Sequence, residues 1–300
     1  MPSPLVISVV LNTNHREDTL ACLASLEKND YENHQVILLD NASSDGTVSA
    51  VQAGFPKVHI LALKENLGYA GNNNVGIAAA IRQGADWVFV LNEDTLLAPD
   101  CISQLVAVGE SDAKYGIVGP LVYHHNEPNV IQTAGGMMDS NYRNWHSGEN
   151  ELDTGQYKEP RPVDWISGCG ILVRRSVIQQ VGGIDARFFY YVEEFEWCVR
   201  AKAAGWTIVN GPAAKLWHKG VQRNYQPKPA VTYYATRNLL LTLQIHHASA
   251  KVWLVNYYQL LRTLVSWTIR PKWRSKREYR DAMWQGLLDF LRQKWGKMPG

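Results

Sequence analysis

Four apolar runs of strand length alternate with helical patterns in the first third of the chain. The runs are LVISVVLN at 5–12, HQVILLD at 34–40, VHILALK at 58–64 and DWVFVLNED at 86–94. The segments between them have helical patterns, as in REDTLACLASLEKN at 16–29 and GNNNVGIAAAIRQG at 71–84. Runs of Val, Ile and Leu without strict alternation are typical of strands covered on both faces. They therefore predict an α/β fold with a mostly parallel central sheet flanked by helices.

Each of these runs ends in polar residues, and in a parallel sheet ligands gather at the carboxyl ends of the strands. The polar residues at one such end are explained by an ordinary turn, since DNASSDGT at 40–47 fits an Asx turn before a capped helix. Four of them at one edge predict a nucleotide pocket, in which Asp40 accepts from a base N–H and Asn and Gly residues approach ribose and phosphates. The predicted contacts are Asn12, Asn14, Asp40, Asn41, Asn66, Gly71, Asn72 and Asn92.

Composition places the chain among globular proteins, because 46% of its 300 residues are hydrophobic and 19% are charged. Its four cysteines are far apart and lack the spacing of a zinc site, so we expect reduced core residues and a reducing cytosol. The apolar run near the N-terminus is too short for a signal peptide or a spanning helix. We therefore expect a cytoplasmic protein, and no nucleic-acid partner.

Seven short segments, in order, resemble one enzyme family. They are VVLNTN, LLDNASSDGT, ENLGYAGNNNVGI, LNEDT, VDWISGCGILVRRSVIQQVGGID, FFYYVEEFEWCVRAKAAGW and AKLWHKG. Their order and spacing resemble the inverting family-2 glycosyltransferases of the GT-A fold, most of all bacterial rhamnosyltransferase-type members. The resemblance covers roughly residues 5 to 240. It implies a catalytic domain over 1–240, with a nucleotide-sugar half at 1–95 and an acceptor half at 96–240, followed by an extension at 241–300.

The resemblance implies a divalent metal at the end of the fourth run. In this family the acidic motif there binds Mg²⁺ or Mn²⁺, which bridges the donor diphosphate, and hard oxygen ligands suit both ions. Asp94 is the first choice as ligand, with Glu93 beside it where many relatives carry Pro. His218 in KLWHKG is the third candidate. The alternatives are that Asp94 caps the following helix and that His218 is simply packed beside Trp217.

A second acidic cluster, EEFE at 193–196, follows YYV. The resemblance implies that the second acid, Glu194, is the catalytic base, with Glu193 as its partner, although the family usually has Asp at that position. Helical spacing puts Glu193 and Trp197 on one face, with Glu194 and Glu196 elsewhere. The alternative is an acidic first turn that complements the helix dipole.

Two further segments fit the resemblance. The SGCG loop, with Ser167, Gly168 and Gly170, is similar to the family's acceptor-side loop. Asp164 and Trp165, just before this loop, are expected to shape the acceptor pocket. The alternative for Trp165 is a position in the core. Arg237, next to Asn238, is expected either to hold the diphosphate or to pair with a structural carboxylate.

The implied reaction is a single displacement, in which an acceptor hydroxyl deprotonated by Glu194 attacks the anomeric carbon and inverts it. The expected donor is a dTDP- or UDP-sugar, with dTDP-rhamnose preferred, and the expected acceptor is a saccharide or a lipid-linked saccharide of cell-surface polysaccharide synthesis. One alternative is an inactive nucleotide-sugar-binding module. A sugar nucleotidyltransferase is disfavoured because no Gly- and Lys-rich loop follows the first strand, and a Rossmann dehydrogenase because no GxGxxG does.

The last fifty residues are basic, with eleven Lys or Arg and three acids in a chain whose net charge is +2. Two helical stretches flank Pro271, and neither is a clean spanning helix. They predict either peripheral attachment to an anionic membrane or packing against the catalytic domain or a second copy in a homodimer. The apolar positions are Trp253, Leu254, Tyr257, Leu260, Leu261 and Leu264, then Trp284, Leu287, Leu288, Leu291 and Trp295, and the basic cluster is Lys272, Arg274, Lys276, Arg277 and Arg280.

Overall fold

A computed structural model describes residues 3–223 and 225–299 of the chain. Its main sheet has the strand order β10-β12-β6-β11-β4-β1-β2-β3. All of these strands run in one direction except β10 and β11, so the central sheet is mostly parallel, as predicted. The strands are β1 (Val6–Asn12), β2 (His34–Asn41), β3 (His59–Leu63), β4 (Trp87–Asn92), β5 (Thr95–Leu97), β6 (Tyr115–His124), β7 (Glu127–Thr133), β8 (Gly136–Met138), β9 (Asn144–His146), β10 (Arg161–Val163), β11 (Gly170–Arg174) and β12 (Thr207–His218).

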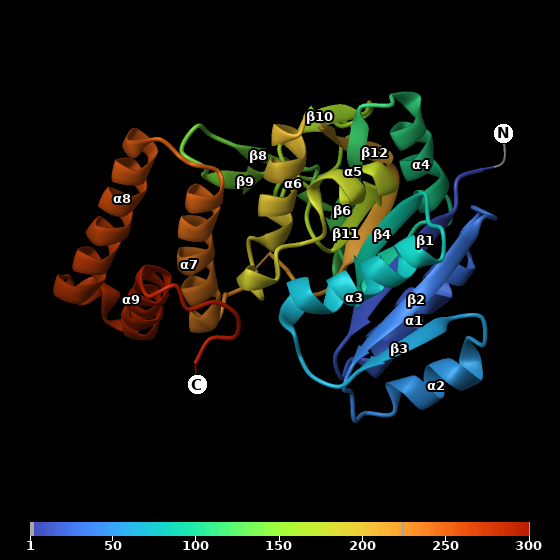
Figure 1. The fold of residues 1–300 in the computed structure, drawn as a ribbon, viewed down its shortest axis with the longest axis horizontal. Helices are drawn as coiled ribbons and strands as arrows, with labels where there is room; N and C mark the ends of the chain where they lie inside the picture. The colour runs from blue at the N-terminus through green and yellow to red at the C-terminus, as the bar shows by residue number, and fades with distance from the viewer. Residues whose placement is uncertain (1–2, 224, 300) are drawn as a thin grey trace.

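Helices cover both faces of this sheet, so the fold is mixed α/β, as predicted (Figure 1). Helices α1, α2 and α4 pack on one face, and α3, α5 and α6 on the other. The helices are α1 (Arg16–Glu27), α2 (Thr47–Gly54), α3 (Gly68–Arg82), α4 (Cys101–Ser111), α5 (Arg175–Val181), α6 (Glu193–Ala203), α7 (Pro229–Ile245), α8 (Ala250–Ile269) and α9 (Arg277–Leu291), with 3₁₀ turns at Ala186–Phe188 and Pro271–Lys276.

The first strand shows why its apolar run does not alternate. Ile7 and Val9 point into the core on one face of the sheet, while Val6 and Val10 point into the core on the other. Because both faces are buried, both sets of positions must be apolar. All four cysteines are buried and unbridged, as the sequence predicted.

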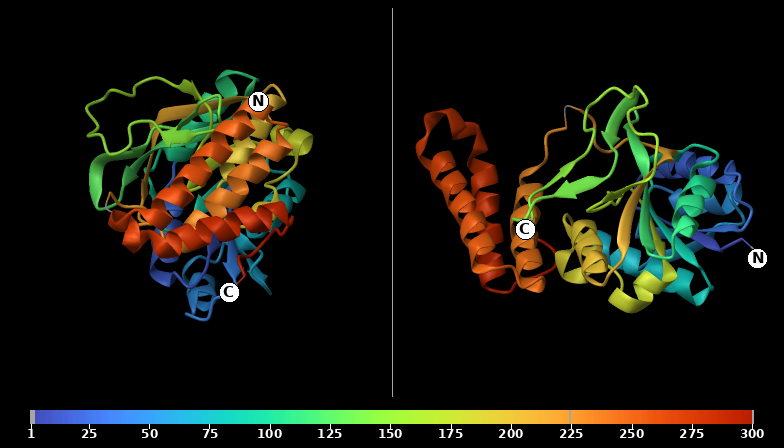
Figure 2. Two further views of the ribbon diagram at one scale, coloured as in Figure 1. Left: turned by 90° about the vertical axis from the view of Figure 1, so that its left-hand side faces the viewer. Right: turned by 90° about the horizontal axis from the view of Figure 1, so that it is seen from above.

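Helices α7, α8 and α9 form a separate layer with its own apolar cluster, at the end of the molecule opposite β2 and β3 (Figure 2). The predicted boundary at residue 240 falls inside α7, and the one at 95 falls in β5. Gly286 of α9 lies so close to α7 that a Cβ there would sit 2.6 Å from the Tyr233 carbonyl oxygen. The extension is therefore packed on α7 rather than a free tail. Among the described residues, no helix is long and apolar enough to cross a bilayer.

Candidate active site

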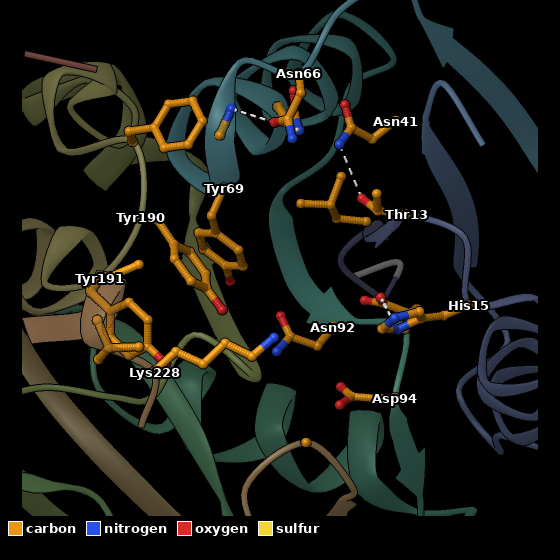
Figure 3. Close-up of a pocket in the computed structure, with 18 of the residues that line it drawn as sticks. Thr13, His15, Asn41, Asn66, Tyr69, Asn92, Asp94, Tyr190, Tyr191 and Lys228 are labelled. Atoms are coloured by element: carbon orange, nitrogen blue, oxygen red, sulfur yellow. Dashed lines mark hydrogen bonds and ion pairs between the residues drawn. The ribbon is translucent and has the colours of Figure 1, made fainter. Parts of the chain in front are cut away.

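Two adjoining cavities lie where β1, β2 and β4 end. The larger has a volume of about 620 Å³ and the smaller about 210 Å³. They share one wall and so form a single cleft. Figure 3 shows the larger cavity with its polar side chains. The predicted convergence of polar strand ends is therefore present in the fold. The shared lining residues are Tyr69, Asn92, Asp94, Tyr190, Tyr191, Gly220 and Tyr225.

Amide side chains form the polar wall of the larger cavity. Asn41 donates from Nδ2 to Thr13 Oγ1 at 3.0 Å, and its Oδ1 is buried without a hydrogen-bond partner. Asn66 Oδ1 accepts from the Gly68 amide at 2.8 Å, and Asn72 holds the Leu67 amide in the same way at 3.0 Å. The unpartnered oxygen of Asn41 is the atom of this wall best suited to bind a polar ligand.

Three predicted nucleotide contacts lie behind or beside this wall, not on it. Asp40 accepts from Asn12 Nδ2 at 2.9 Å and from the Ser43 amide at 3.1 Å, so its carboxylate ties β1 to the loop after β2. Asn14 accepts from the Ser44 amide at 2.8 Å. The described lining contains none of Asn12, Asn14 and Asp40. These contacts tie the loops of the cleft together, and each Asp40 oxygen keeps a free lone pair. The role of Asp40 toward a base stays a prediction.

In α3, the glycine that lines the larger cavity is Gly68 and not the predicted Gly71. Gly68 has φ +77°, and a Cβ on it would come within 2.5 Å of the Phe189 ring. Only glycine permits both that backbone conformation and that contact. Gly71 lies one turn further along α3 against Leu67, away from the described lining.

Asp94 and His218 face each other at the wall between the two cavities. Asp94 Oδ1 lies 3.3 Å from His218 Nε2 and has no hydrogen-bond partner, although it is buried. Burial disfavours the ionised carboxylate, but the adjacent His218 outweighs it and lowers the pKa of Asp94 below its ordinary value. The capping alternative for Asp94 is wrong, because α4 begins at Cys101 with Asp100 at its N-cap position.

Gln132 fixes the tautomer of His218. Gln132 Nε2 donates to the Val221 carbonyl at 2.9 Å, which leaves its Oε1 to accept from His218 Nδ1 at 3.0 Å. The hydrogen on Nδ1 therefore turns the lone pair of a neutral His218 Nε2 toward Asp94. The Asp94 carboxylate and a neutral Nε2 are both electron-rich, so either a proton on Nε2 or a metal ion between the two atoms satisfies both.

These atoms fit a divalent metal ion. Adjacent ligands of an octahedral ion with bonds near 2.1 Å lie about 3 Å apart, close to the Asp94–His218 separation. The described residues contain no group of three or more acidic, His or Cys side chains placed to hold a metal. Few protein ligands suit Mg²⁺-type ions, which keep waters and take the rest of their oxygens from phosphates. Gly220 permits this approach, since a Cβ there would be 2.5 Å from Asp94 Oδ2.

Glu93 lines the larger cavity but is paired with His15. Its Oε1 lies 2.9 Å from His15 Nδ1, and burial with the neighbouring charge of Asp94 raises the pKa of Glu93 to about 8. A raised pKa favours the protonated carboxyl, which binds a cation less well than a carboxylate does. Asp94 with His218 therefore fits a divalent cation better than Glu93 does.

Glu193 and Glu194 both line the smaller cavity at the start of α6. Their Oε2 atoms are buried without hydrogen-bond partners. Burial raises the pKa of Glu194, and burial together with the charge of Glu194 raises the pKa of Glu193 well above its ordinary value. A carboxylate with a raised pKa is a better proton acceptor near neutral pH. Glu196 is elsewhere, since Arg200 at 2.9 Å and His246 at 3.2 Å bind it.

The turn before these acids has an unusual backbone. Phe189, Tyr191 and Val192 have φ of +64°, +65° and +75°. Side chains rarely adopt this region, and each such residue costs roughly 1–3 kcal/mol. The turn therefore needs support from outside itself.

That support comes from Arg237 and Asn238 on α7. Asn238 Nδ2 lies 2.9 Å from the Phe188 and Tyr190 carbonyl oxygens and 2.7 Å from that of Tyr191, and Arg237 Nη2 donates to Phe188 O at 2.9 Å. We call these contacts the carbonyl clamp. At about 1 kcal/mol or more each, these bonds offset much of the strain. Arg237 is fully buried and outside the described lining, so it holds the turn and neither a diphosphate nor a carboxylate.

The SGCG loop lines the smaller cavity through Ser167, Gly168 and Cys169, and its acceptor-side role stays a prediction. Tyr69 fixes it by donating from its hydroxyl to the Gly168 carbonyl at 2.6 Å. Asp164 and Trp165 do not line either cavity. Asp164 accepts from the Met138 amide at 2.7 Å and pairs with Lys202, while the Trp165 ring is buried, so the core alternative for Trp165 is the correct one.

Sequence reasoning missed the residues that irregular segments bring to the cleft. Lys228 is the one Lys or Arg among the described lining of the larger cavity, and Figure 3 shows its side chain extended into it. The paired tyrosines of YYV just before the acidic cluster were a signal, since aromatic residues beside carboxylates often line binding sites. The missed lining residues include Thr13, His15, Tyr69, Tyr190, Tyr191, Tyr225 and Lys228.

The family described as Glycosyl transferase family 2 matches residues 6–182. The chain is 31% identical over 271 residues to an N-acetylglucosaminyl-diphospho-decaprenol L-rhamnosyltransferase of Mycobacterium tuberculosis (strain ATCC 25618 / H37Rv), covering 83% of each chain. It is 23% identical to the dTDP-rhamnosyl transferase RfbF of Shigella flexneri, with 87% of each chain covered.

Among solved structures, a mannosyltransferase from Pyrobaculum calidifontis in complex with GDP-Man and Mn²⁺ is similar in fold. The match has a TM-score of 0.62 at 16% identity and covers 98% of this chain and 89% of that one. The family match spans more than half of the chain, and the solved structure confirms the GT-A fold. The chain therefore belongs to glycosyl transferase family 2, and it is an inverting glycosyltransferase of rhamnosyltransferase-like sequence.

Proposed function

We propose that this enzyme transfers rhamnose from dTDP-rhamnose to a lipid-linked saccharide in cell-surface polysaccharide synthesis. The observation that carries the proposal is the 31% identity, over 83% of both chains, to a rhamnosyltransferase whose name specifies a diphospho-decaprenol acceptor. The similarity to a dTDP-rhamnosyl transferase supports the same donor over a UDP-sugar. We further propose that the enzyme works in the cytoplasm, at the inner face of the plasma membrane where such an acceptor lies.

The proposed cofactor is Mg²⁺ or Mn²⁺, held by Asp94 and His218. When bound, such an ion would neutralise charge on the departing diphosphate. The solved mannosyltransferase of this fold, which contains Mn²⁺, supports the choice of a divalent ion. Asn41, Asn66 and Asn72 would position the nucleotide half of the donor in the larger cavity.

In the proposed reaction Glu194 acts as base in the smaller cavity. It takes the proton of an acceptor hydroxyl, whose oxygen forms a bond to the anomeric carbon of the donor sugar. The bond from that carbon to the diphosphate oxygen breaks on the opposite face, so the configuration inverts and nucleoside diphosphate leaves. Burial raises the pKa of Glu194, which favours proton capture, and the charge of Glu194 in turn raises the pKa of Glu193 beside it.

Donor binding tests the proposed substrate. Purified protein with Mn²⁺ is titrated with dTDP-rhamnose, UDP-glucose and GDP-mannose, and its melting temperature is followed. A true donor at a hundred times its Kd stabilises the native state by about 2.7 kcal/mol, so we expect a clear upward shift with dTDP-rhamnose and much less with the others. A shift with a UDP- or GDP-sugar alone contradicts the proposed donor.

The inactive-module alternative predicts binding without chemistry. An active transferase slowly releases nucleoside diphosphate from its donor even without acceptor, whereas a binding module does not. The buried, unpartnered carboxylate oxygens of Asp94, Glu193 and Glu194 favour the active enzyme, because a purely structural role would have paired them.

Lys228→Met should weaken donor binding about tenfold, because a hydrogen bond between charged groups contributes about 1.5–3 kcal/mol and Lys228 supplies the positive charge of the larger cavity. Calorimetric titration with dTDP measures the change in Kd, which should shrink at high salt. Lys219→Met is the matched control, since Lys219 is already paired with Asp18. Equal effects of the two substitutions would exclude a direct contact by Lys228.

A further inference from the structure

The helix α8 uses only one of its two apolar faces inside the molecule. Trp253, Leu260 and Leu264 belong to the apolar cluster that α8 shares with α7 and α9, together with Leu243 and Leu287. The alternative in which the extension packs on the rest of the chain is therefore correct for this inner face. A helix that is apolar on a second side usually has a partner there as well.

Five large side chains of α8 point away from that cluster. Their exposed fractions are 72% for Leu254, 67% for Tyr258, 48% for Leu261, 54% for Val265 and 68% for Ile269. Spacing of three or four residues places them on one stripe, which we call the outer face. It borders a groove of about 600 Å³. Figures 1 and 2 show α8 as the outermost helix of its end of the molecule.

The charge around the outer face has one sign. Residues 250–277 contain no Asp or Glu. Within the part of the chain that the structure describes, none of the basic residues there forms a salt bridge. Lys272 and Lys276 lie over the rings of Trp273 and Tyr279 instead. The basic residues of this segment are Lys251, Arg262, Arg270, Lys272, Arg274, Lys276 and Arg277.

This charge decides between two occupants of the outer face. A second copy related by a twofold axis would present the same surface, and so would bring the uncompensated basic residues together. An anionic lipid surface would bury the apolar stripe at its headgroup boundary and neutralise the flanking Arg and Lys. Trp and Tyr beside Lys and Arg are also typical of that boundary.

We propose that the outer face of α8 docks on an anionic lipid membrane. Leu254, Leu261 and Val265 enter the headgroup boundary, while Arg270 and Lys272 contact lipid phosphates. The proposal deepens the proposed function, since it would place the cleft beside a lipid-linked acceptor, but the docking itself is measured without any transfer.

The test is sedimentation of the full chain with phosphatidylcholine vesicles, with and without phosphatidylglycerol. We expect binding only to the anionic vesicles, and this binding should be weakened by salt.

The double substitution Arg270→Gln with Lys272→Gln should weaken vesicle binding roughly thirtyfold, because each basic residue near the surface contributes about 1 kcal/mol. Leu254→Ser with Leu261→Ser should weaken it at least about tenfold. Leu152→Ser, 59% exposed on another segment, is the matched control and should bind like the unchanged protein.

Three results would overturn the proposal. The protein would fail to bind anionic vesicles, or the α8 variants would bind them as well as the unchanged protein does. The third result is a dimer in vesicle-free solution that becomes monomeric when the α8 substitutions are made. Melting temperatures near that of the unchanged protein show that the variants are folded. If transfer to a water-soluble acceptor persists when vesicle binding is absent, only the docking proposal fails. If vesicles bind but no donor does, the proposed function fails and the docking surface stands.

Discussion

Replacing Asp94 with Ala should reduce transfer by roughly three orders of magnitude or more, because the variant loses the carboxylate proposed to hold the cation at the leaving diphosphate. The fold should survive, since Asp94 Oδ1 has no hydrogen-bond partner to lose. Initial rates with Mn²⁺ measure the first effect. Electron paramagnetic resonance of bound Mn²⁺ and the melting temperature measure metal loss and folding separately.

Glu93→Gln is the matched control for this change. It removes the adjacent acid, whose oxygen faces His15 at 2.9 Å, and should lower the rate by no more than about tenfold. Full activity of Asp94→Ala would contradict the metal-binding role, and loss of activity together with unfolding would show a structural one.

Glu194→Gln should lower turnover by roughly two orders of magnitude or more, because the amide keeps the shape of the side chain but cannot accept a proton. Donor affinity should change little, since Glu194 lines only the smaller cavity. Presteady-state and steady-state rates with dTDP-rhamnose, beside the Kd for dTDP, measure the two quantities. Retained turnover, with loss in Glu193→Gln instead, would move the base to Glu193.

The pH dependence follows from the direction of the Glu194 pKa shift. Burial raises this pKa above its ordinary value of 4.5, so the carboxyl gains its proton as pH falls through the raised pKa. The rate should therefore fall on the acid side beginning above pH 4.5, and the Gln variant should lack this limb. The raised pKa also means that ionised Glu194 destabilises the native state as pH rises above 4.5. The Gln variant should consequently melt higher at neutral pH.

The sequence predicted the sheet and much of the cleft because both follow from repeating geometry. Parallel strands bring their ends to one edge, and this alone places Asn41, Asn92 and Asp94 around one space. What the sequence could not predict is that Asp40 accepts from Asn12, twenty-eight residues away, because this contact depends on the register between β1 and β2.

Other features depend on irregular backbone or on three-dimensional packing that local patterns do not encode. Lys228 reaches the cleft from a loop, and Tyr190 and Tyr191 from a strained turn. The guanidinium N–H groups of Arg237 can donate equally well to a phosphate or to a carbonyl oxygen. The residue type alone therefore could not show which of these two acceptors Arg237 binds. The helical periodicity of α8 predicted one apolar face, while the exposed Tyr258, Val265 and Ile269 form a second.

The carbonyl clamp also links the acid-bearing turn to the end of the chain. Arg237 Nη1 donates to the Gly296 carbonyl at 2.7 Å while Nη2 of the same guanidinium holds Phe188. Tyr233, one turn before Arg237, donates to Asp289 at 3.0 Å. Gly296 and Asp289 lie about a hundred residues after Glu194 in the sequence, and neither lines the cleft. A substitution in this distant segment would therefore act on the acidic pair only through Tyr233 and Arg237.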